Sequence, residues 1–210
     1  MYEKVIIFDF DGVILDSVDI KTSAFQDLFK EQTEKVQKKI INYHIINGGI
    51  SRIKKFEYFY KVFLKKKITN KIKKDLSNKF NRIVYKKILK CKFIKGADKF
   101  IKKNKDYHLF ISSGTPEKEL KLICKKRGIS KYFKEIYGSP KSKVDHIKKI
   151  QKTLKKAALF IFIGDSKNDY DAAIKTKIEF IQVGNNIKNK TITKNKIKTL
   201  EKLNHFLKKI

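Results

Sequence analysis

The sequence predicts an α/β protein, in which a parallel sheet with helices on both faces carries an inserted α-helical domain. Short apolar runs rich in Val, Ile and Phe alternate along much of the chain with amphipathic stretches, which is the pattern of parallel strands joined by helices. One long segment after the first apolar run has helical periodicity throughout. A chain of 210 residues is long enough to bury a core of this kind.

The strands of the predicted sheet are five apolar runs. The first is Lys4–Phe8, which is bounded by acids and then by Gly12, as expected for a strand buried on both faces. Four similar runs follow it, at residues 108–111, 135–137 (the weakest), 159–163 and 180–183. Amphipathic helices are expected between them, and the apolar positions from Leu200 to Ile210 predict a closing helix after a polar loop over 185–198.

The helical segment interrupts this alternation. Two apolar stripes with helical spacing mark it, one formed by Ile53, Phe56, Tyr60 and Phe63 and the other by Ile72, Leu76, Phe80 and Ile83. We therefore expect a core domain made of residues 1–16 and 93–210 and a helical domain made of residues 17–92. Because both ends of the insert join the core, it is a candidate lid.

The chain is strongly basic, with 52 Lys plus Arg against 21 Asp plus Glu and a formal net charge of +31. Such a charge is typical of proteins that bind polyanions. However, only Arg52, Arg82 and Arg127 are arginines, and the lysines are spread over every segment, whereas readers of nucleic acid depend on arginine. We favour a compositional bias and expect no specific nucleic acid partner.

Cysteine content and hydropathy indicate the compartment. Cys91 and Cys124 are too few for a disulfide framework or a zinc site, which favours a reducing cytosol. No apolar stretch approaches the roughly 18 residues of a membrane span. We expect a cytoplasmic protein that does not enter a membrane.

Acidic residues follow two of the predicted strands. Asp9 and Asp11 come directly after the first strand, and Asp165 and Asp169 follow the run 159–163. Ligands of open parallel sheets bind at the carboxyl ends of the strands, and carboxylates gathered there are costly unless a cation joins them. Mg2+ prefers oxygen ligands of this kind, so the two acidic ends together predict a magnesium site.

Two further strand ends are suited to phosphate. After 108–111 the chain reads Ser112-Ser113-Gly114-Thr115-Pro116, where hydroxyl and N–H groups precede a helix whose N-cap we expect to be Thr115. After 135–137 it reads Gly138-Ser139-Pro140-Lys141-Ser142-Lys143. Lys143 can hold a phosphate and offset the neighbouring carboxylates.

These residues resemble the haloacid dehalogenase-like (HAD) hydrolase superfamily, and the resemblance spans essentially the whole chain. The four family motifs appear in order: the segment from Asp9 to Ser17, Ser112, Lys143, and the segment from Gly164 to Asp169. A helical insert directly after the first motif resembles the subfamily that includes phosphoglycolate phosphatase and β-phosphoglucomutase. The resemblance implies a Rossmann-like core with a helical cap.

The resemblance also implies roles for individual residues. Asp9 would be the nucleophile that forms a phosphoaspartate and a ligand of Mg2+, and Asp11 would be the general acid and base, with its backbone carbonyl on the metal. Asp165 would complete the protein ligands and Asp169 would orient the metal shell. The phosphoryl group would be held by Ser112, Ser113, Gly114 and Lys143.

The insert supplies candidates for substrate selection. Paired glycines in the segment 44–52 permit a tight turn before Ser51, the expected N-cap of the next helix. Arg52 is the arginine of this loop, and its guanidinium suits a carboxylate or another anion of the substrate. His44 and Lys55 are weaker candidates, because a packed histidine and a solvated lysine are equally consistent with the sequence.

The sequence leads to a Mg2+-dependent phosphatase of small phosphorylated metabolites, such as a sugar phosphate or phosphoglycolate, acting as a monomer or small homo-oligomer. The alternatives are a phosphomutase and, in another class, a basic nucleic-acid-binding protein on an inactive HAD-like fold. Dehalogenation is disfavoured because, in the family, dehalogenases lack an acid at the position of Asp11. A phosphonatase would need a Schiff-base lysine in the insert, which the many lysines neither reveal nor exclude.

Overall fold

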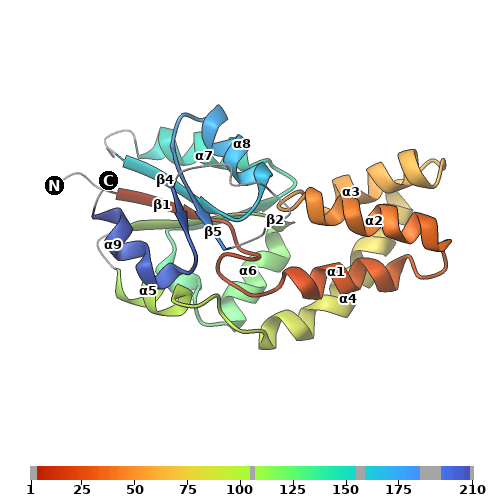
Figure 1. The fold of residues 1–210 in the computed structure, drawn as a ribbon, viewed down its shortest axis with the longest axis horizontal. Helices are drawn as coiled ribbons and strands as arrows, with labels where there is room; N and C mark the ends of the chain where they lie inside the picture. Colours follow the sequence, from red (N-terminus) through yellow and green to blue (C-terminus); the bar gives the residue numbers. More distant parts are fainter. Residues whose placement is uncertain (1–3, 105–106, 155–158, 185–194, 209–210) are drawn as a thin grey trace.

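The protein is built around a six-stranded parallel sheet with the order β3-β2-β1-β4-β5-β6. The computed structural model describes residues 4–104, 107–154, 159–184 and 195–208. The strands are β1 (Lys4–Phe8), β2 (His108–Pro116), β3 (Glu135–Ser139), β4 (Leu159–Gly164), β5 (Glu179–Val183) and β6 (Lys196–Ile197). Helices cover both faces of this sheet (Figure 1), which confirms the predicted α/β class.

Helices of the core lie on the two faces in separate groups. Ile147 of α7 (Lys143–Thr153) and Ala172 of α8 (Lys167–Lys175) pack on one face, against Val5 and Ile7. The other face is covered by α5 (Ala97–Lys103), α6 (Glu117–Lys126) and α9 (Leu203–Leu207), with 3-10 turns at Ser130–Tyr132 and Leu200–Lys202. The closing helix is therefore confirmed, although it is short.

Two local predictions are wrong. The run 108–111 extends as a strand to Pro116, so α6 begins at Glu117 with Pro116 as its N-cap, and Thr115 does not cap it. Within the predicted polar loop 185–198, Lys196–Ile197 forms β6, which pairs with β5 through Gln182 and Val183. Residues 185–194 of that loop lie outside the described part of the chain.

The insert consists of helices and lies beyond the carboxyl ends of the strands (Figure 1). It contains α1 (Val18–Leu28), α2 (Glu34–Ile46), α3 (Arg52–Tyr58), a π-helical turn (Phe59–Phe63) and α4 (Asn70–Lys90). Its centre is aromatic, since Phe25 packs on Phe56, Phe59 and Phe80 at 4.9 to 5.8 Å between ring centroids. The exact domain limits and the movement of the insert as a lid stay predictions.

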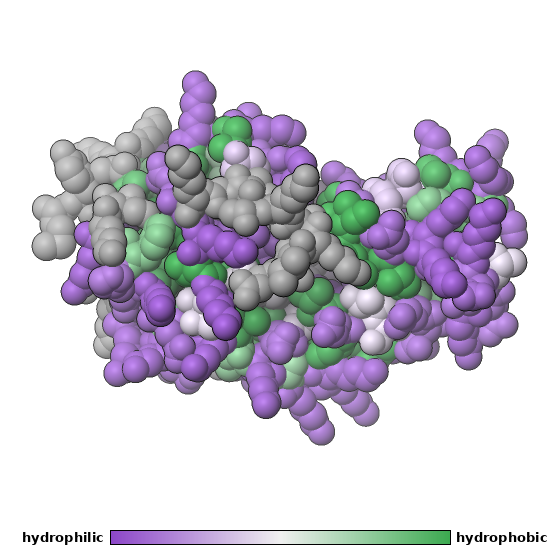
Figure 2. Space-filling model, in the orientation of Figure 1, coloured by the Kyte–Doolittle hydropathy of each residue, from purple (hydrophilic) through white to green (hydrophobic). Residues whose placement is uncertain are grey.

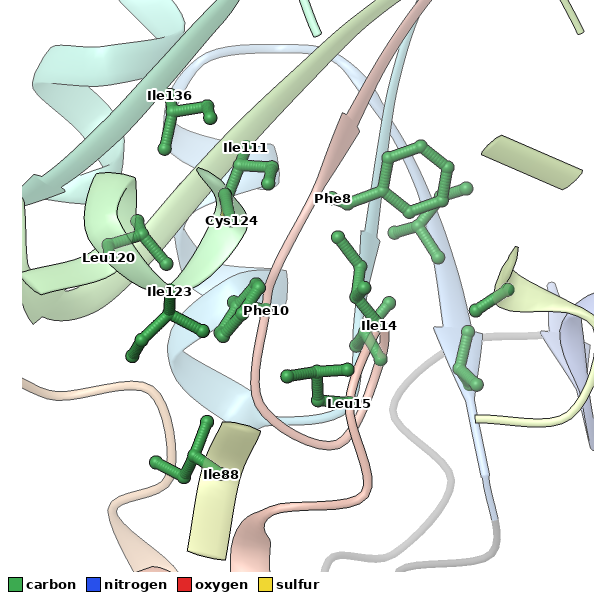
Figure 3. Packing of buried hydrophobic residues seen from close by; sticks show 14 of the residues in the cluster. Phe8, Phe10, Ile14, Leu15, Ile88, Ile111, Leu120, Ile123, Cys124 and Ile136 are labelled. Atoms are coloured by element: carbon green, nitrogen blue, oxygen red, sulfur yellow. The ribbon is translucent and has the colours of Figure 1, made fainter. Parts of the chain in front are cut away.

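The loop after β1 is fixed by its apolar side chains. Phe10, Ile14 and Leu15 are almost completely buried, and Figure 3 shows Phe10 and Leu15 close to Ile123 of α6 and Ile88 of α4. Backbone hydrogen bonds tighten the loop, because the amides of Ile14 and Leu15 both donate to the carbonyl of Phe10. The loop that follows Asp9 is therefore held in place by packing on α4 and α6.

The surface is largely hydrophilic. Figure 2 shows hydrophilic residues spread over both the sheet domain and the helical insert on the visible face. Among the described helices, none combines the length and the apolar character that crossing a bilayer requires.

Candidate active site

The topology brings the acidic strand ends together. From β1 the chain builds outward through β2 and β3 and then returns to β4, on the other side of β1, so a crevice opens at the carboxyl ends of β1 and β4. Asp9 follows β1, and its amide donates to the carbonyl of Ile163 in β4 at 2.9 Å. Asp165 directly follows the end of β4. The predicted convergence of the two acidic ends is therefore confirmed.

Three carboxylates form a cluster that suits a divalent cation. One oxygen each from Asp9, Asp165 and Asp169 lies within 4.8 Å of the others. Lys143, the first residue of α7, places its Nζ 2.9 Å from Oδ1 of Asp9 and pairs also with Asp169. Three carboxylates against one ammonium leave an excess of negative charge that a divalent cation would balance. The donor set therefore fits Mg2+.

The pKa values of the buried groups in this cluster are shifted by burial and by the neighbouring charges. Burial raises the pKa of Asp9 to about 7, opposed by Lys143 and assisted by the charges of Asp169 and Asp11. Burial, followed by the charges of Asp9 and Asp169, also raises the pKa of Asp165 well above its ordinary value. Lys143 is buried, yet the two carboxylates beside it hold its pKa above the usual value, so it stays an ammonium.

Asp11 lines the same cavity as Asp9 but has different partners. Asp9 pairs with Lys143, whereas Asp11 pairs with Lys21. Asp11 accepts hydrogen bonds from Ser17 Oγ at 2.6 Å, from Thr115 Oγ1 at 3.2 Å and from Lys21 of α1. Burial alone would raise the pKa of Asp11, but Lys21, Ser17 and Thr115 together lower it.

Gly12 allows the loop to approach Asp165. Its φ is +80°, and a Cβ placed on it would lie 2.3 Å from Oδ2 of Asp165. A side chain is therefore excluded both by the left-handed backbone and by the carboxylate beside it. The glycine of the first motif is thus part of the geometry that brings the two acidic strand ends together.

The predicted phosphate-binding residues differ in whether they line the cavity. Gly114 lines the cavity together with Thr115, whereas Ser112, Ser113 and Lys143 are buried and are not among the residues that line it. Ser112 Oγ lies 2.9 Å from Nδ1 of His146, whose Nε2 lies 3.2 Å from the carbonyl of Gly138. Because Nε2 must donate to that carbonyl, Nδ1 accepts from the serine hydroxyl. Burial lowers the pKa of His146 to about 4, which agrees with a neutral ring.

A cavity of about 310 Å³ separates the sheet from the insert. From the sheet it is lined by Asp9, Asp11, Gly114, Thr115 and Asp165, and from the insert by Lys21, His44, Arg52, Lys55 and the apolar side chains of Phe25 and Phe80. The loop of the insert closes over it, because a Cβ on Gly114 would lie 2.5 Å from the carbonyl oxygen of Gly49. Asn168 Nδ2 also donates to that carbonyl at 3.3 Å.

Arg52 does line the cavity, but it already has an acidic partner. Its Nη2 pairs with Glu119 of α6, and its guanidinium lies 4.9 Å from the centroid of the Phe80 ring. Its Nε and Nη1 are buried without a hydrogen-bond partner among the described residues. Ser51 caps α3, as predicted, by accepting from the amide of Lys54.

Several residues of the site were not singled out from the sequence. Lys21 is one lysine among 49 and has no motif around it. The hydroxyl of Thr115 was assigned to a helix cap, and His146 lies one turn into α7 with no local signal. Only the three-dimensional arrangement of the elements brings these groups to Asp11 and Ser112.

The comparisons with known proteins agree with this architecture. The family model for haloacid dehalogenase-like hydrolases matches residues 6–183. A β-phosphoglucomutase of Clostridium difficile superposes with a TM-score of 0.76 at 20% identity, covering 100% of this chain and 96% of that one. A protein of Clostridium acetobutylicum described as a predicted phosphatase gives 0.75 at 19% identity, with 100% of both chains covered.

A HAD hydrolase of Bacillus subtilis, solved with bound magnesium, gives a TM-score of 0.71 at 19% identity and covers 99% of both chains. No curated protein sequence matches the chain. At such identities the solved structures establish the fold. The match of the family model covers most of the chain, and together with the acids at the ends of β1 and β4 it shows that the chain belongs to the haloacid dehalogenase-like hydrolases.

Proposed function

We propose that this hydrolase is a Mg2+-dependent phosphatase of small phosphate monoesters that works through a phosphoaspartate on Asp9. The observation that carries the proposal is the position of the Asp9 carboxylate, which lines the cavity, lies 2.9 Å from the ammonium of Lys143 and shares a cluster with Asp165 and Asp169. A nucleophilic carboxylate needs this combination of access and neighbouring positive charge in order to approach an anionic phosphate.

The residues that would hold the metal are Asp9 and Asp165 through their carboxylates and Asp11 through its backbone carbonyl. Both oxygens of Asp169 are occupied, one by Lys143 and the other by the amide and hydroxyl of Ser166, which suits a residue that orients the shell. When bound, Mg2+ would offset the repulsion between the carboxylate and the phosphate.

The protein groups account for both halves of a hydrolysis. In the first, an Asp9 oxygen bonds to phosphorus, the bond from phosphorus to the ester oxygen breaks, and that oxygen takes a proton from Asp11. Asp11 must therefore enter this step protonated, against the charge of Lys21 that lowers its pKa. In the second, Asp11 takes a proton from water, which attacks the phosphoaspartate, so that inorganic phosphate leaves and Asp9 is restored. Lys143 and the backbone near Ser113 and Gly114 would hold the phosphoryl oxygens, and the hydroxyl of Ser112 would join them by exchanging its hydrogen bond to His146 for one to a phosphoryl oxygen.

The cavity favours a small substrate. Its volume of about 310 Å³ lies at the lower end of ligand pockets, which suits a sugar phosphate or a phosphoglycolate-like ester and excludes a folded polynucleotide from the carboxylates. Arg52, with two unpartnered N–H groups, would contact the part of the substrate outside the phosphate. We expect a cytoplasmic enzyme, monomeric or a small homo-oligomer, that needs no nucleic acid or membrane.

The test is phosphate release from a panel of phosphorylated metabolites with and without Mg2+, for the wild type, Asp9→Asn and the matched control Asp27→Asn, which changes an exposed acid on α1. Activity that depends on Mg2+ and is lost only in Asp9→Asn is expected. Equal activity in the wild type and Asp9→Asn would remove the nucleophile assignment. A phosphoenzyme that outlasts seconds in water would indicate a phosphomutase instead.

A further inference from the structure

The insert lines the cavity with a lysine that the phosphatase chemistry does not use. Lys55 of α3 is only 3% exposed and lines the cavity. Among the described residues, the cavity-lining cations of the insert are Lys21, Arg52 and Lys55, and the first two are paired with Asp11 and Glu119. Lys55 makes no ion pair with any described carboxylate. A buried cation without a counter-ion is costly unless a ligand supplies one.

The hydrogen bonds around Lys55 fix its orientation. Thr22 Oγ1 donates to the carbonyl of Val18 at 2.9 Å, so its lone pair accepts from Nε2 of His44 at 3.2 Å. Nδ1 of His44 is then unprotonated and accepts from Lys55 Nζ at 2.8 Å. Burial lowers the pKa of His44 to about 2, in agreement with a neutral ring.

These contacts leave one donor of Lys55 for a ligand. A second N–H of the ammonium reaches the carbonyl of His44 at 3.3 Å, and the third has no acceptor among the described residues. The nearest aromatic ring, that of Phe25, has its centroid 5.7 Å from Nζ, which gives only weak stabilisation. Burial lowers the pKa of Lys55 to about 7, as expected for a buried amine without a counter-ion, and an anionic ligand beside it would favour the charged form. Held in place by His44, this amine lines the cavity from the side of the insert.

We propose that Lys55, positioned by His44, is a subsite for a carboxylate on the leaving group of the substrate, so that the preferred substrates are phosphate monoesters of small hydroxy acids. The inference rests on the proposed phosphatase function. A carboxylate matches the one unpaired charge of Lys55, whereas a second phosphate dianion would keep one negative charge unpaired in a buried site. A neutral alcohol would leave the lysine without a counter-ion.

The test compares two esters that differ only in this group, 3-phosphoglycerate and glycerol 3-phosphate. The wild type is expected to prefer 3-phosphoglycerate in kcat/KM. Lys55→Met should reduce this preference by about 10- to 100-fold, the loss expected for one charge-assisted hydrogen bond, chiefly through KM. Lys54→Met, which changes an exposed lysine of the same helix, serves as the matched control and should keep the preference.

A binding measurement on inactive variants tests the Lys55 subsite independently of the proposed phosphatase activity. Calorimetric titration of both esters into Asp9→Asn and Asp9→Asn/Lys55→Met, with Mg2+ present, measures the preference without turnover. Selective binding that depends on Lys55 supports the subsite even if the wild type hydrolyses neither ester. Hydrolysis of both esters with equal losses in Lys55→Met overturns the subsite and leaves the phosphatase intact.

Two other results would also overturn the subsite. One is the absence of any preference of the wild type for 3-phosphoglycerate, in turnover and in binding alike. The other is permanent attachment of phosphonoacetaldehyde to Lys55 after borohydride reduction, detected by mass spectrometry, because it would show that the lysine reacts with a carbonyl instead of pairing with a carboxylate.

Discussion

The ammonium of Lys143 lies 2.9 Å from Oδ1 of Asp9, and both side chains are at least 95% buried. The pair joins the first turn of α7 to the end of β1, two elements that are far apart in the sequence. Since Lys143 also pairs with Asp169, one cation holds two of the three carboxylates of the cluster. Its removal would change both the chemistry and the stability of the site.

Lys143→Met is expected to lower kcat by at least about 100-fold, because it removes the charge that lets the Asp9 carboxylate approach a phosphate. It should also lower the free energy of unfolding by roughly 3 kcal/mol, since it leaves buried carboxylates without their partner. Steady-state kinetics and urea denaturation measure the two effects. Lys148→Met, on the exposed side of the same helix, is the control, and a kcat for Lys143→Met within threefold of that control would contradict the assignment.

Gly12→Ala should damage the metal site through Asp165. The new Cβ would lie 2.3 Å from Oδ2 of Asp165, so the carboxylate must move. Gly128 offers a matched control, because its φ of +69° is similar and nothing lies within 4 Å of its added Cβ. Both variants carry a backbone strain of about 1 to 2 kcal/mol, but only Gly12→Ala should raise the Mg2+ concentration needed for half-maximal activity. An equal Mg2+ dependence in the two variants would exclude the proposed contact.

The sequence predicted the sheet and the acidic cluster for physical reasons that act locally. Buried strands such as Lys4–Phe8 must be apolar on both faces, and residues that follow parallel strands meet at one edge. For this reason the sequence alone predicts that Asp9 and Asp165 lie close together. The two-residue strand β6 has no comparable signal, since its pairing with Gln182 and Val183 alone defines it.

The roles of individual lysines could not be predicted from the sequence. Lys21 and Lys55 have the same local context as many exposed lysines, and they differ only because the helices of the insert turn them toward the sheet. The pairing of Arg52 with Glu119 could not be predicted from the sequence either, because Glu119 lies 67 residues further along the chain. Such contacts depend on how the insert sits on the core, and no local pattern encodes that.

Gly114→Ala tests whether the insert must close on the sheet for activity. A methyl group at Gly114 would lie 2.5 Å from the carbonyl oxygen of Gly49, so the loop of the insert must move away. Displacement of the insert loop by an ångström or more is expected to lower kcat/KM by about 100-fold. The thermal unfolding midpoint should change little, because the apolar cores are untouched. Unchanged kcat/KM would mean that the closed contact is not needed for catalysis.

Arg52→Met separates pairing with Glu119 from contact with the substrate. Loss of the guanidinium leaves Glu119, whose side chain is 10% exposed, without its partner, which should lower the free energy of unfolding by about 3 kcal/mol. The double variant Arg52→Met/Glu119→Met should recover much of this stability, as measured by urea denaturation. If Arg52 also binds the substrate, KM stays raised in the double variant; a KM that returns to the wild-type value would restrict Arg52 to pairing with Glu119.

The buried His146 predicts a stability that falls with acidification. Burial holds its pKa at about 4 in the folded protein, below the ordinary value of about 6.5 in the unfolded chain. Between these values the unfolded chain binds more protons, so the contribution of His146 is fully present above pH 6.5 and is lost as the pH falls toward 4. The slope due to this residue is about 1 kcal/mol per pH unit.

His146→Asn keeps an amide that can contact Ser112 but loses the ring that also donates to the carbonyl of Gly138, so it should be less stable than the wild type at pH 7. Because asparagine does not titrate, the variant should show a shallower loss of stability between pH 6.5 and 4. Urea denaturation across this range measures both curves. Part of the dependence will remain in the variant, because His44 is also buried with a lowered pKa. Parallel curves for the two proteins would show that His146 is already protonated in the folded state, and its Nδ1 would then be unable to accept from the hydroxyl of Ser112.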